Sequence, residues 1–247
     1  MVRRNGVSMD IRELRTEHIE FSGEIMDRVL RSAILNSNVI DVIQDNKRPF
    51  DELMSKYRCA IMEIETKFKV LNEQYSLQYD RNPIETIKTR LKSMESISRK
   101  LAQKGKSFSA KSMEENLDDI AGVRVICSFQ EDIYTLAKCL LDQDDIELLE
   151  TKDYIKNPKP SGYRSLHLIV RVPIFLQNEK CLMKVEVQLR TIAMDFWASL
   201  EHDIKYKTNN KLTKKMSNEL VKCAKMINKM DDKMLVLKYG DGTKTKI

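Results

Sequence analysis

The sequence predicts an α/β or α+β protein in which a mixed β-sheet is flanked by helices, with helical extensions at both ends. From Pro83 to about Lys207, strand-like and helix-like stretches alternate, as they do where helices pack on a sheet in layers. Only 7 glycines and 5 prolines occur and 32% of the residues are charged, which favours long helices around a modest sheet. With 247 residues, 42% of them hydrophobic, the chain can bury one sizeable core.

The N-terminal region, residues 1–82, is predicted to be helical, and its pattern runs from Ile11 to about Leu77. Within it, apolar residues recur at alternating steps of four and three, which draws one stripe along a long helix: Leu53, Tyr57, Ile61, Ile64, Phe68, Leu71 and Tyr75. Such a stripe packs either on the helix's own domain or on a second subunit of an oligomer. The sequence leaves both interpretations open.

The middle region, residues 83–207, carries the alternating pattern. Extended stretches are predicted at residues 84–92, 120–128, 146–155, 163–175 and 181–191. Helices are predicted at residues 94–105, 131–143 and 191–207. Gly105 closes the first of these helices, and the last two strands follow each other closely enough to pair as a hairpin. The C-terminal region, residues 208–247, adds a helix from Leu212 to Leu237 with a solvated lysine face, and a tail.

Composition predicts a cytoplasmic protein with no membrane partner. The five cysteines are scattered, odd in number and without a CxxC pair, which indicates reduced thiols and neither a disulfide framework nor a zinc site. No apolar run approaches the roughly 18 residues of a membrane span. The N-terminus has basic residues but no hydrophobic segment behind them, so it does not resemble a signal peptide. Net charge is only +6, so the clustering of charges is more informative than their total.

The stretch KDYIKNPKPSGYRSLH, Lys152 to His167, is a stiff, basic, aromatic loop that leads into a strand. It lacks the fingerprints GxGxxG and GxxxxGK[ST], so any nucleotide bound there would be held by side-chain cations and by stacking. Prolines on both sides of Lys159 restrict the backbone there, so less conformational entropy is lost when Lys159 binds an anion. Tyr163 offers a flat face to a base.

Two polar strand faces adjoin this loop. Side chains alternate along a strand, so one face of the last strand carries Lys184, Glu186, Gln188 and Arg190, and its neighbour carries Tyr163, Ser165 and His167. A solvated sheet face is ordinary by itself. Beside the loop, however, it brings a carboxylate, an amide, an imidazole and several cations to one surface. A second basic set precedes it, formed by Arg90, Lys92, Ser96 and Lys100, and Asp118 and Asp119 stand before a strand, where a carboxylate binds a metal or caps a helix.

Four motifs in order carry a family resemblance: Arg90-x-Lys92-x-x-x-Ser96-Ile97-x-x-Lys100, Asp119-Ile120-Ala121-Gly122-Val123-Arg124, the loop from Lys152 to His167, and Glu186-Val187-Gln188-Leu189-Arg190-Thr191. Together they resemble the synthetase domain of the RelA/SpoT alarmone enzymes. The resemblance covers about residues 83–207, and the short chain looks most similar to the stand-alone small alarmone synthetases of the RelQ type.

The resemblance implies a nucleotidyltransferase-like fold, Mg²⁺ as cofactor, and transfer of pyrophosphate from ATP to the 3′-hydroxyl of GDP or GTP, with GMP as a further acceptor. It implies ATP-binding roles for Arg90, Lys92, Ser96, Lys100 and Arg124. Asp119 would hold the metal, and Glu186 would hold it too and act as the base. The acceptor would be bound by Lys152, Lys159, Tyr163, His167 and Gln188. A homotetramer through the terminal helices is also expected.

Some residues depart from the family pattern. Glu150-Thr151-Lys152-Asp153 mixes the RxKD and ExDD variants, which leaves the choice among GMP, GDP and GTP open. Ser161 stands where many relatives have asparagine. His202-Asp203 resembles part of an HD hydrolase, but the other ligands of that domain are missing, so we interpret His202 as structural and expect no hydrolase.

Two rival functions remain open. A nucleotide sensor or single-stranded RNA-binding module on the same fold would use basic and aromatic residues as well, and single-stranded RNA is also a candidate regulator of a synthetase. Such a module would not need Asp119 or Glu186. An unrelated metal-dependent nucleotidyltransferase would release pyrophosphate, whereas an alarmone synthetase releases AMP.

Overall fold

The protein was analysed as a computed structural model that describes residues 37–79, 81–207 and 212–240. Its contacts separate two units, Met1–Phe50 with Met94–Leu117, and Asp51–Ser93 with Asp118–Ile247. The helix predicted from Ile11 lies outside the described residues as far as residue 36.

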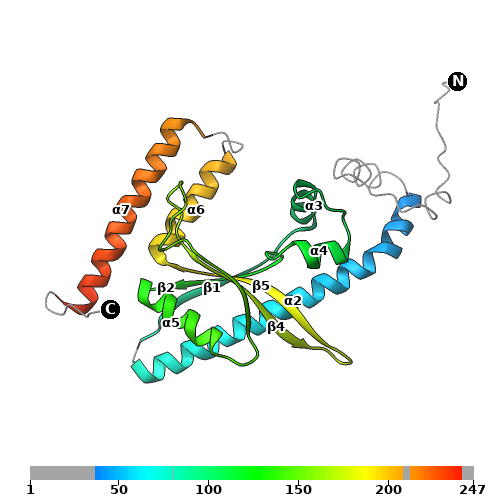
Figure 1. Cartoon of the computed structure of the whole chain (residues 1–247), viewed down its shortest axis with the longest axis horizontal. Coiled ribbons are helices and arrows are strands. Elements are labelled where there is room, and N and C mark those ends of the chain that lie inside the picture. The colour runs from blue at the N-terminus through cyan, green and yellow to red at the C-terminus, as the bar shows by residue number, and fades with distance from the viewer. Residues whose placement is uncertain (1–36, 80, 208–211, 241–247) are drawn as a thin grey trace. The chain divides into compact units, whose positions relative to one another are not determined.

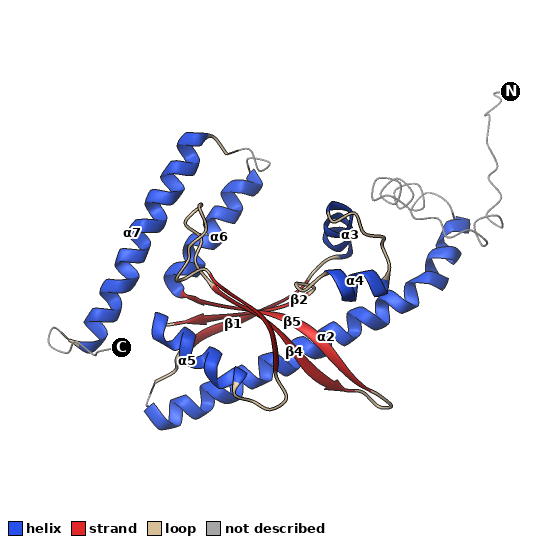
Figure 2. Cartoon of the chain, in the orientation of Figure 1, coloured by secondary structure: helices blue, strands red, loops and turns tan. Residues whose placement is uncertain are grey.

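The larger unit is built on a five-stranded sheet with the strand order β1-β2-β5-β4-β3 (Figure 2). The strands are β1 (Ile84–Leu91), β2 (Ala121–Cys127), β3 (Glu147–Asp153), β4 (Leu166–Phe175) and β5 (Lys180–Thr191). Neighbours pair antiparallel except β2 and β5, which are parallel. The sheet is therefore mixed, as predicted, and the predicted hairpin of β4 and β5 is confirmed.

Helix α2 (Ser37–Tyr79) carries the predicted apolar stripe. From Asp51 onward it runs along the sheet beside α5 (Gln130–Leu141) (Figure 1). Tyr57, Ile64 and Phe68 are at most 1% exposed, and Lys67 Nζ lies 2.6 Å from an Asp145 carboxylate oxygen just before β3. The stripe is thus covered by its own chain, and of the two interpretations the packing on the helix's own domain is confirmed.

The two faces of the sheet differ because strand register puts like residues side by side. Val123, Val187 and Leu168 align across β2, β5 and β4, and each is at most 1% exposed. One residue further along, Arg124 aligns with Gln188, and Gln188 with His167. One face is therefore the core under the helices, and the other is polar.

Two further helices follow the sheet, α6 (Ile192–Lys207) and α7 (Lys214–Tyr239). Trp197 Nε1 donates to the carbonyl oxygen of Leu220 at 3.1 Å, and Thr191 Oγ1 donates to Asp231 at 2.8 Å, so α7 is tied to both α6 and the end of β5. Gly162 also packs here: it has φ of +92°, and a Cβ on it would lie 2.5 Å from the Cβ of Ala224. Helix α7 thereby lies against the loop that precedes β4.

The smaller unit contains α3 (Met94–Gln103) and α4 (Ala110–Asn116). Ile97 and Leu101 are buried, and Gly105 has φ of +65° just after α3, as its predicted closing role requires. Helix α4 was not predicted, because it is too short to show a period. It starts at Ser109, whose side chain accepts a hydrogen bond from the backbone N–H of Ser112. In the described part of the chain, no helix is long and apolar enough to cross a membrane.

Candidate active site

On the polar face of the sheet, strand register aligns residues in two rows across the strands. The first row runs through all five strands: Lys88, Arg124, Gln188, His167 and Lys152. The second row lies one pleat along: Arg90, Gly122, Glu186, Ile169 and Glu150. Glu186 therefore sits in mid-sheet beside a row of basic and amide groups.

Glu186 is largely buried, and its carboxylate is hydrogen-bonded on both oxygens. His167 Nδ1 lies 3.0 Å from Oε1, and Gln188 Nε2 donates to Oε2 at 2.9 Å. Burial alone would raise the pKa of this carboxyl, but the bonds from His167 and Gln188 outweigh it and the pKa is lowered. Glu186 is thus ionised at neutral pH. The neighbouring cations Lys184 and Arg190 pair with other carboxylates, Asp118 and Asp195.

The direction of the hydrogen bonds around His167 follows from the donors present. Arg190 Nη2 donates to the hydroxyl oxygen of Tyr163 at 2.5 Å, and that hydroxyl lies 2.7 Å from His167 Nε2. Arginine can only donate and the ionised Glu186 carboxylate can only accept, so the Tyr163 oxygen accepts from Arg190 and His167 Nδ1 donates to Glu186. In the neutral imidazole, Nε2 then carries no proton and accepts the hydroxyl proton of Tyr163. The bonds run in one direction from Arg190 to Glu186.

Asp118 and Asp119 both form ion pairs where the chain enters β2. Asp119 lies 2.6 Å from Lys92 Nζ, and Asp118 lies 2.7 Å from Lys184 Nζ. Asp119 is close enough to Glu186 for its negative charge to raise the pKa of that carboxyl. The two carboxylates named for the metal thus lie near each other on the same unit. Among the described residues, no group of three or more histidine, cysteine, aspartate or glutamate side chains is arranged to hold a metal ion.

The loop from Lys152 to His167 gathers rings and cations over the end of the sheet. Lys159 Nζ lies 4.5 Å from the ring centroid of Tyr154 and 5.0 Å from that of Tyr163. A hydrogen bond from the Gly162 amide to the Lys159 carbonyl, 2.8 Å long, closes the turn. Lys152 is paired with Glu150 at 2.7 Å, and this bond raises the pKa of the lysine.

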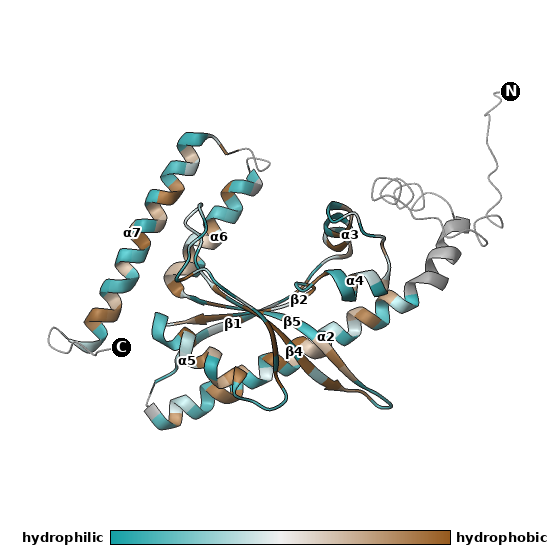
Figure 3. Cartoon of the chain, in the orientation of Figure 1, coloured by the Kyte–Doolittle hydropathy of each residue, from teal (hydrophilic) through white to brown (hydrophobic). Residues whose placement is uncertain are grey.

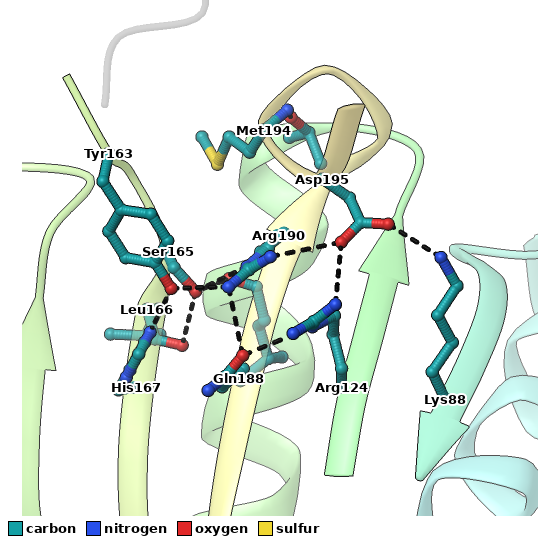
Figure 4. Close-up of polar contacts among 12 residues, drawn as sticks. Lys88, Arg124, Tyr163, Ser165, Leu166, His167, Gln188, Arg190, Met194 and Asp195 are labelled. Atoms are coloured by element: carbon teal, nitrogen blue, oxygen red, sulfur yellow. Dashed lines mark hydrogen bonds and ion pairs between the residues drawn. The ribbon is translucent and has the colours of Figure 1, made fainter. Parts of the chain in front are cut away.

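The sequence reasoning missed Asp195, in the first turn of α6. It is 7% exposed and lies among basic side chains from three strands: Lys88 at 2.8 Å, Arg190 at 3.2 Å and Arg124 at 3.4 Å (Figure 4). Burial would raise the pKa of Asp195, but the bond from Lys88 and the charges of Arg124 and Arg190 lower it. Its only sequence signal is an acidic residue five positions after Arg190, at the start of a helix.

The remaining predicted residues divide between the two units. Arg90 lies exposed on the second row, whereas Ser96 and Lys100 lie on α3 in the smaller unit. His202 is 80% exposed and lies 3.8 Å from Asp203, itself 71% exposed. The interpretation of His202 as a structural residue is therefore wrong, since nothing packs it into a core.

A sheet face that sets two carboxylates among basic side chains is suited to phosphate chemistry. Cations offset phosphate charge, and a carboxylate holds a metal ion or accepts a proton. The fold and the site thus define an enzyme that transfers a phosphate-containing group.

Comparison with known proteins identifies the family. Residues 89–211 match the family model described as the region found in RelA / SpoT proteins. The GTP pyrophosphokinase YwaC of Bacillus subtilis is 48% identical over 182 residues, which cover 74% of this chain and 87% of YwaC. YjbM, a second GTP pyrophosphokinase of the same organism, is 33% identical over 190 residues, covering 77% of this chain and 88% of YjbM.

Solved structures agree. Small alarmone synthetase 2 from Bacillus subtilis has a TM-score of 0.71 at 45% identity, over 77% of this chain and 98% of that one. Small alarmone synthetase 1, solved with its product pppGpp, has a TM-score of 0.72 at 31% identity, over 78% and 98%. The chain belongs to the RelA/SpoT family of GTP pyrophosphokinases and is a small alarmone synthetase. The family match within the 247 residues is to the synthetase and to no hydrolase domain.

Proposed function

We propose that this enzyme transfers the pyrophosphate group of ATP to the ribose 3′-hydroxyl of GDP or GTP, with GMP as a further acceptor, in stringent-response signalling. The 3′-oxygen forms a bond to the β-phosphorus of ATP, the bond from that phosphorus to the α,β-bridging oxygen breaks, and AMP leaves. The products are AMP together with ppGpp from GDP, pppGpp from GTP or pGpp from GMP. Support comes from relatives named GTP pyrophosphokinase and from small alarmone synthetase 1, which was solved with pppGpp and with the ATP analogue AMPCPP.

The observation that carries the proposal is the state of Glu186. Its carboxylate is ionised and held on both oxygens by His167 and Gln188, in mid-sheet beside the first row of polar side chains. A sugar hydroxyl is a poor nucleophile until its proton is removed. A positioned base contributes roughly 10²–10⁴-fold to such a step, and Glu186 is the group proposed to take this proton.

The two nucleotides are assigned to opposite ends of the polar face. On the larger unit, Arg90, Lys92 and Arg124 would bind the phosphates of ATP and offset the repulsion between two polyanions. At the other end, Lys152 and Lys159 would bind the phosphates of the acceptor. Tyr163 would stack on its guanine, while His167 and Gln188 orient both the acceptor and Glu186. On the smaller unit, Ser96 and Lys100 keep the ATP-binding roles that the family resemblance implies.

Magnesium fits the residues present. Mg²⁺ in such sites is bound by one or two carboxylates together with substrate phosphates and water, and Asp119 and Glu186 supply two carboxylates whose charges already act on each other. When bound, the ion would neutralise charge on the phosphates of ATP. Lys92, 2.6 Å from Asp119, would keep that carboxylate oriented.

We also propose that the enzyme works in the cytoplasm and assembles as a homotetramer through terminal helices. Of these, α7 is the candidate, because Met226, Met230, Met234 and Leu237 are each at least 54% exposed along it. Figure 3 shows hydrophobic residues recurring along this helix. The stripe on α2 is already covered. Single-stranded RNA is a candidate regulator, to be tested as a ligand of the assembled enzyme.

The proposal is tested by incubating the protein with Mg²⁺, ATP and GDP and separating the products. AMP and a 3′-pyrophosphorylated guanine nucleotide are expected in equal amounts, and chelation of Mg²⁺ should stop both. Release of inorganic pyrophosphate would instead indicate a nucleotidyltransferase. Binding of nucleotides or RNA with no AMP formed would favour a sensor module.

A further inference from the structure

Asp195 joins the two halves of the site without facing solvent. Asp195 is 7% exposed, and its carboxylate contacts both Arg124 and Arg190 (Figure 4). Arg124 belongs to the proposed ATP side. Arg190 bonds to Tyr163 and to Gln188 Oε1 on the proposed acceptor side, at 2.5 and 3.1 Å. One carboxylate therefore touches both sets of residues.

Charge explains why a carboxylate is needed at this place. Arg190 is 4% exposed, and the charge of Arg190 acts unfavourably on Arg124, which also bonds to Gln188 Oε1 at 3.3 Å. Two guanidinium groups that meet at one amide oxygen repel each other strongly where little water screens them. Asp195 δ1 oxygen lies within 3.4 Å of a nitrogen of each guanidinium, so its negative charge offsets that repulsion and fixes both groups in place.

The acceptor side depends on Arg190 in turn. Arg190 bonds to four side chains of the same unit: Ser165, Tyr163, Gln188 and Asp195. From Tyr163 the hydrogen bonds continue through His167 to Glu186. If Arg190 shifts, Tyr163 and Gln188 both lose the bond that orients them.

We propose that Asp195 is a positioning residue that aligns the ATP-binding Arg124 and, through Arg190, the acceptor-binding Tyr163 and Gln188. The assignment of these residues to ATP and to the acceptor nucleotide rests on the proposed function. Asp195 itself touches neither nucleotide. The specific consequence is that one buried side chain sets the affinity for both ligands.

The test is Asp195→Asn, which keeps the shape of the side chain and removes its charge. In this variant Arg190 and Arg124 lose their negatively charged partner. The dissociation constants of AMPCPP and of GDP, each titrated alone by calorimetry, should therefore rise by about ten-fold or more. KM for ATP and for GDP should rise with them. The matched control is Glu219→Gln on α7, a carboxylate-to-amide change at an exposed ion pair with Lys222, which should leave both constants unchanged.

A second substitution examines the charge balance directly. Lys88 is 54% exposed and is the outermost cation of the cluster. Asp195→Asn adds one net positive charge, and Lys88→Gln in the same chain removes one, so the double variant should recover part of both affinities. A role limited to holding the fold together would lower the melting temperature and the active fraction, but it would leave both dissociation constants as in the parent.

Each other outcome is informative. Unchanged affinities, tighter binding of both ligands, or a change for AMPCPP alone in Asp195→Asn would overturn the proposal. If that variant does not fold, Asp195→Glu takes its place, because it keeps the negative charge but moves it by one methylene group. Wild-type affinity of Asp195→Glu for both ligands would also overturn the proposal. A parent protein that binds both ligands but forms no AMP refutes the proposed function and leaves the binding test valid, whereas a parent that binds neither refutes both.

Discussion

At the scale of single residues, neighbours set the chemistry of the site. Glu186 is a buried carboxyl whose pKa would rise from burial alone, and hydrogen bonds from His167 and Gln188 reverse that effect. The sequence alternation correctly assigned Glu186, Gln188 and Arg190 to one face of β5. It could not identify Asp195, because its three basic partners come from β1, β2 and β5 and meet only in the folded sheet.

Glu186→Gln tests the base. The amide keeps the size of the side chain but loses charge and basicity, so turnover should fall by at least about 100-fold, while both nucleotides still bind. Single-turnover formation of AMP measures the chemical step. Glu147→Gln provides the control, because Glu147 is a carboxylate of the same sheet paired with Arg171 at 2.7 Å and outside both rows. Turnover within a few-fold of the parent would leave the proposed mechanism without its base.

Tyr163 combines two contributions that substitution separates. Tyr163→Ala removes the ring, and the loss of stacking of about 1–3 kcal/mol should raise KM for GDP while binding of AMPCPP changes little. Tyr163→Phe keeps the ring but deletes the hydroxyl between Arg190 and His167, so it should lower kcat more than it changes KM. Equal losses of AMPCPP and GDP affinity in Tyr163→Ala would show that the stacking assignment is wrong.

At the scale of elements, sequence periodicity predicts which helices and strands form, but it does not predict which strands pair. Every strand and helix predicted within the described residues is present, since each is long enough to show its period, and only the short helix α4 was missed. The β4–β5 hairpin was predictable because its strands are adjacent in sequence. The parallel pairing of β2 with β5 was not, because more than fifty residues separate Cys127 from Lys180 and no local pattern reports such a contact.

Phe68→Ala examines the packing of α2. Phe68 is fully buried, and removing a buried phenylalanine side chain typically costs about 3–5 kcal/mol of unfolding free energy. The denaturation midpoint should therefore fall clearly, with no change in the number of subunits. Val70 is 62% exposed on the same helix, so Val70→Ala should have little effect. A change of molar mass with unaltered stability would assign the stripe to a subunit contact instead.

At the scale of the whole molecule, exposed apolar surface on α7 concerns assembly. We expect a homotetramer by multi-angle light scattering at micromolar concentration. Met230, 63% exposed in mid-helix, is the substitution site: Met230→Glu should reduce the molar mass. Met62→Glu, at a position 57% exposed on α2, should not. A parent protein that is monomeric under these conditions contradicts the expectation.

The parallel seam between β2 and β5 has a consequence for biosynthesis. A ribosome makes β1 and β2 first, then β3 and β4, and adds β5 last, yet β5 takes the place between β2 and β4. A nascent chain that ends before β5 carries Asp119 and Arg124 but lacks Glu186 and Gln188, so its sheet is split into two pieces. Translation must therefore pass Thr191, three quarters of the way along the chain, before the proposed nucleotide chemistry can begin. A polypeptide released earlier from a stalled ribosome would be unable to carry out the proposed alarmone synthesis.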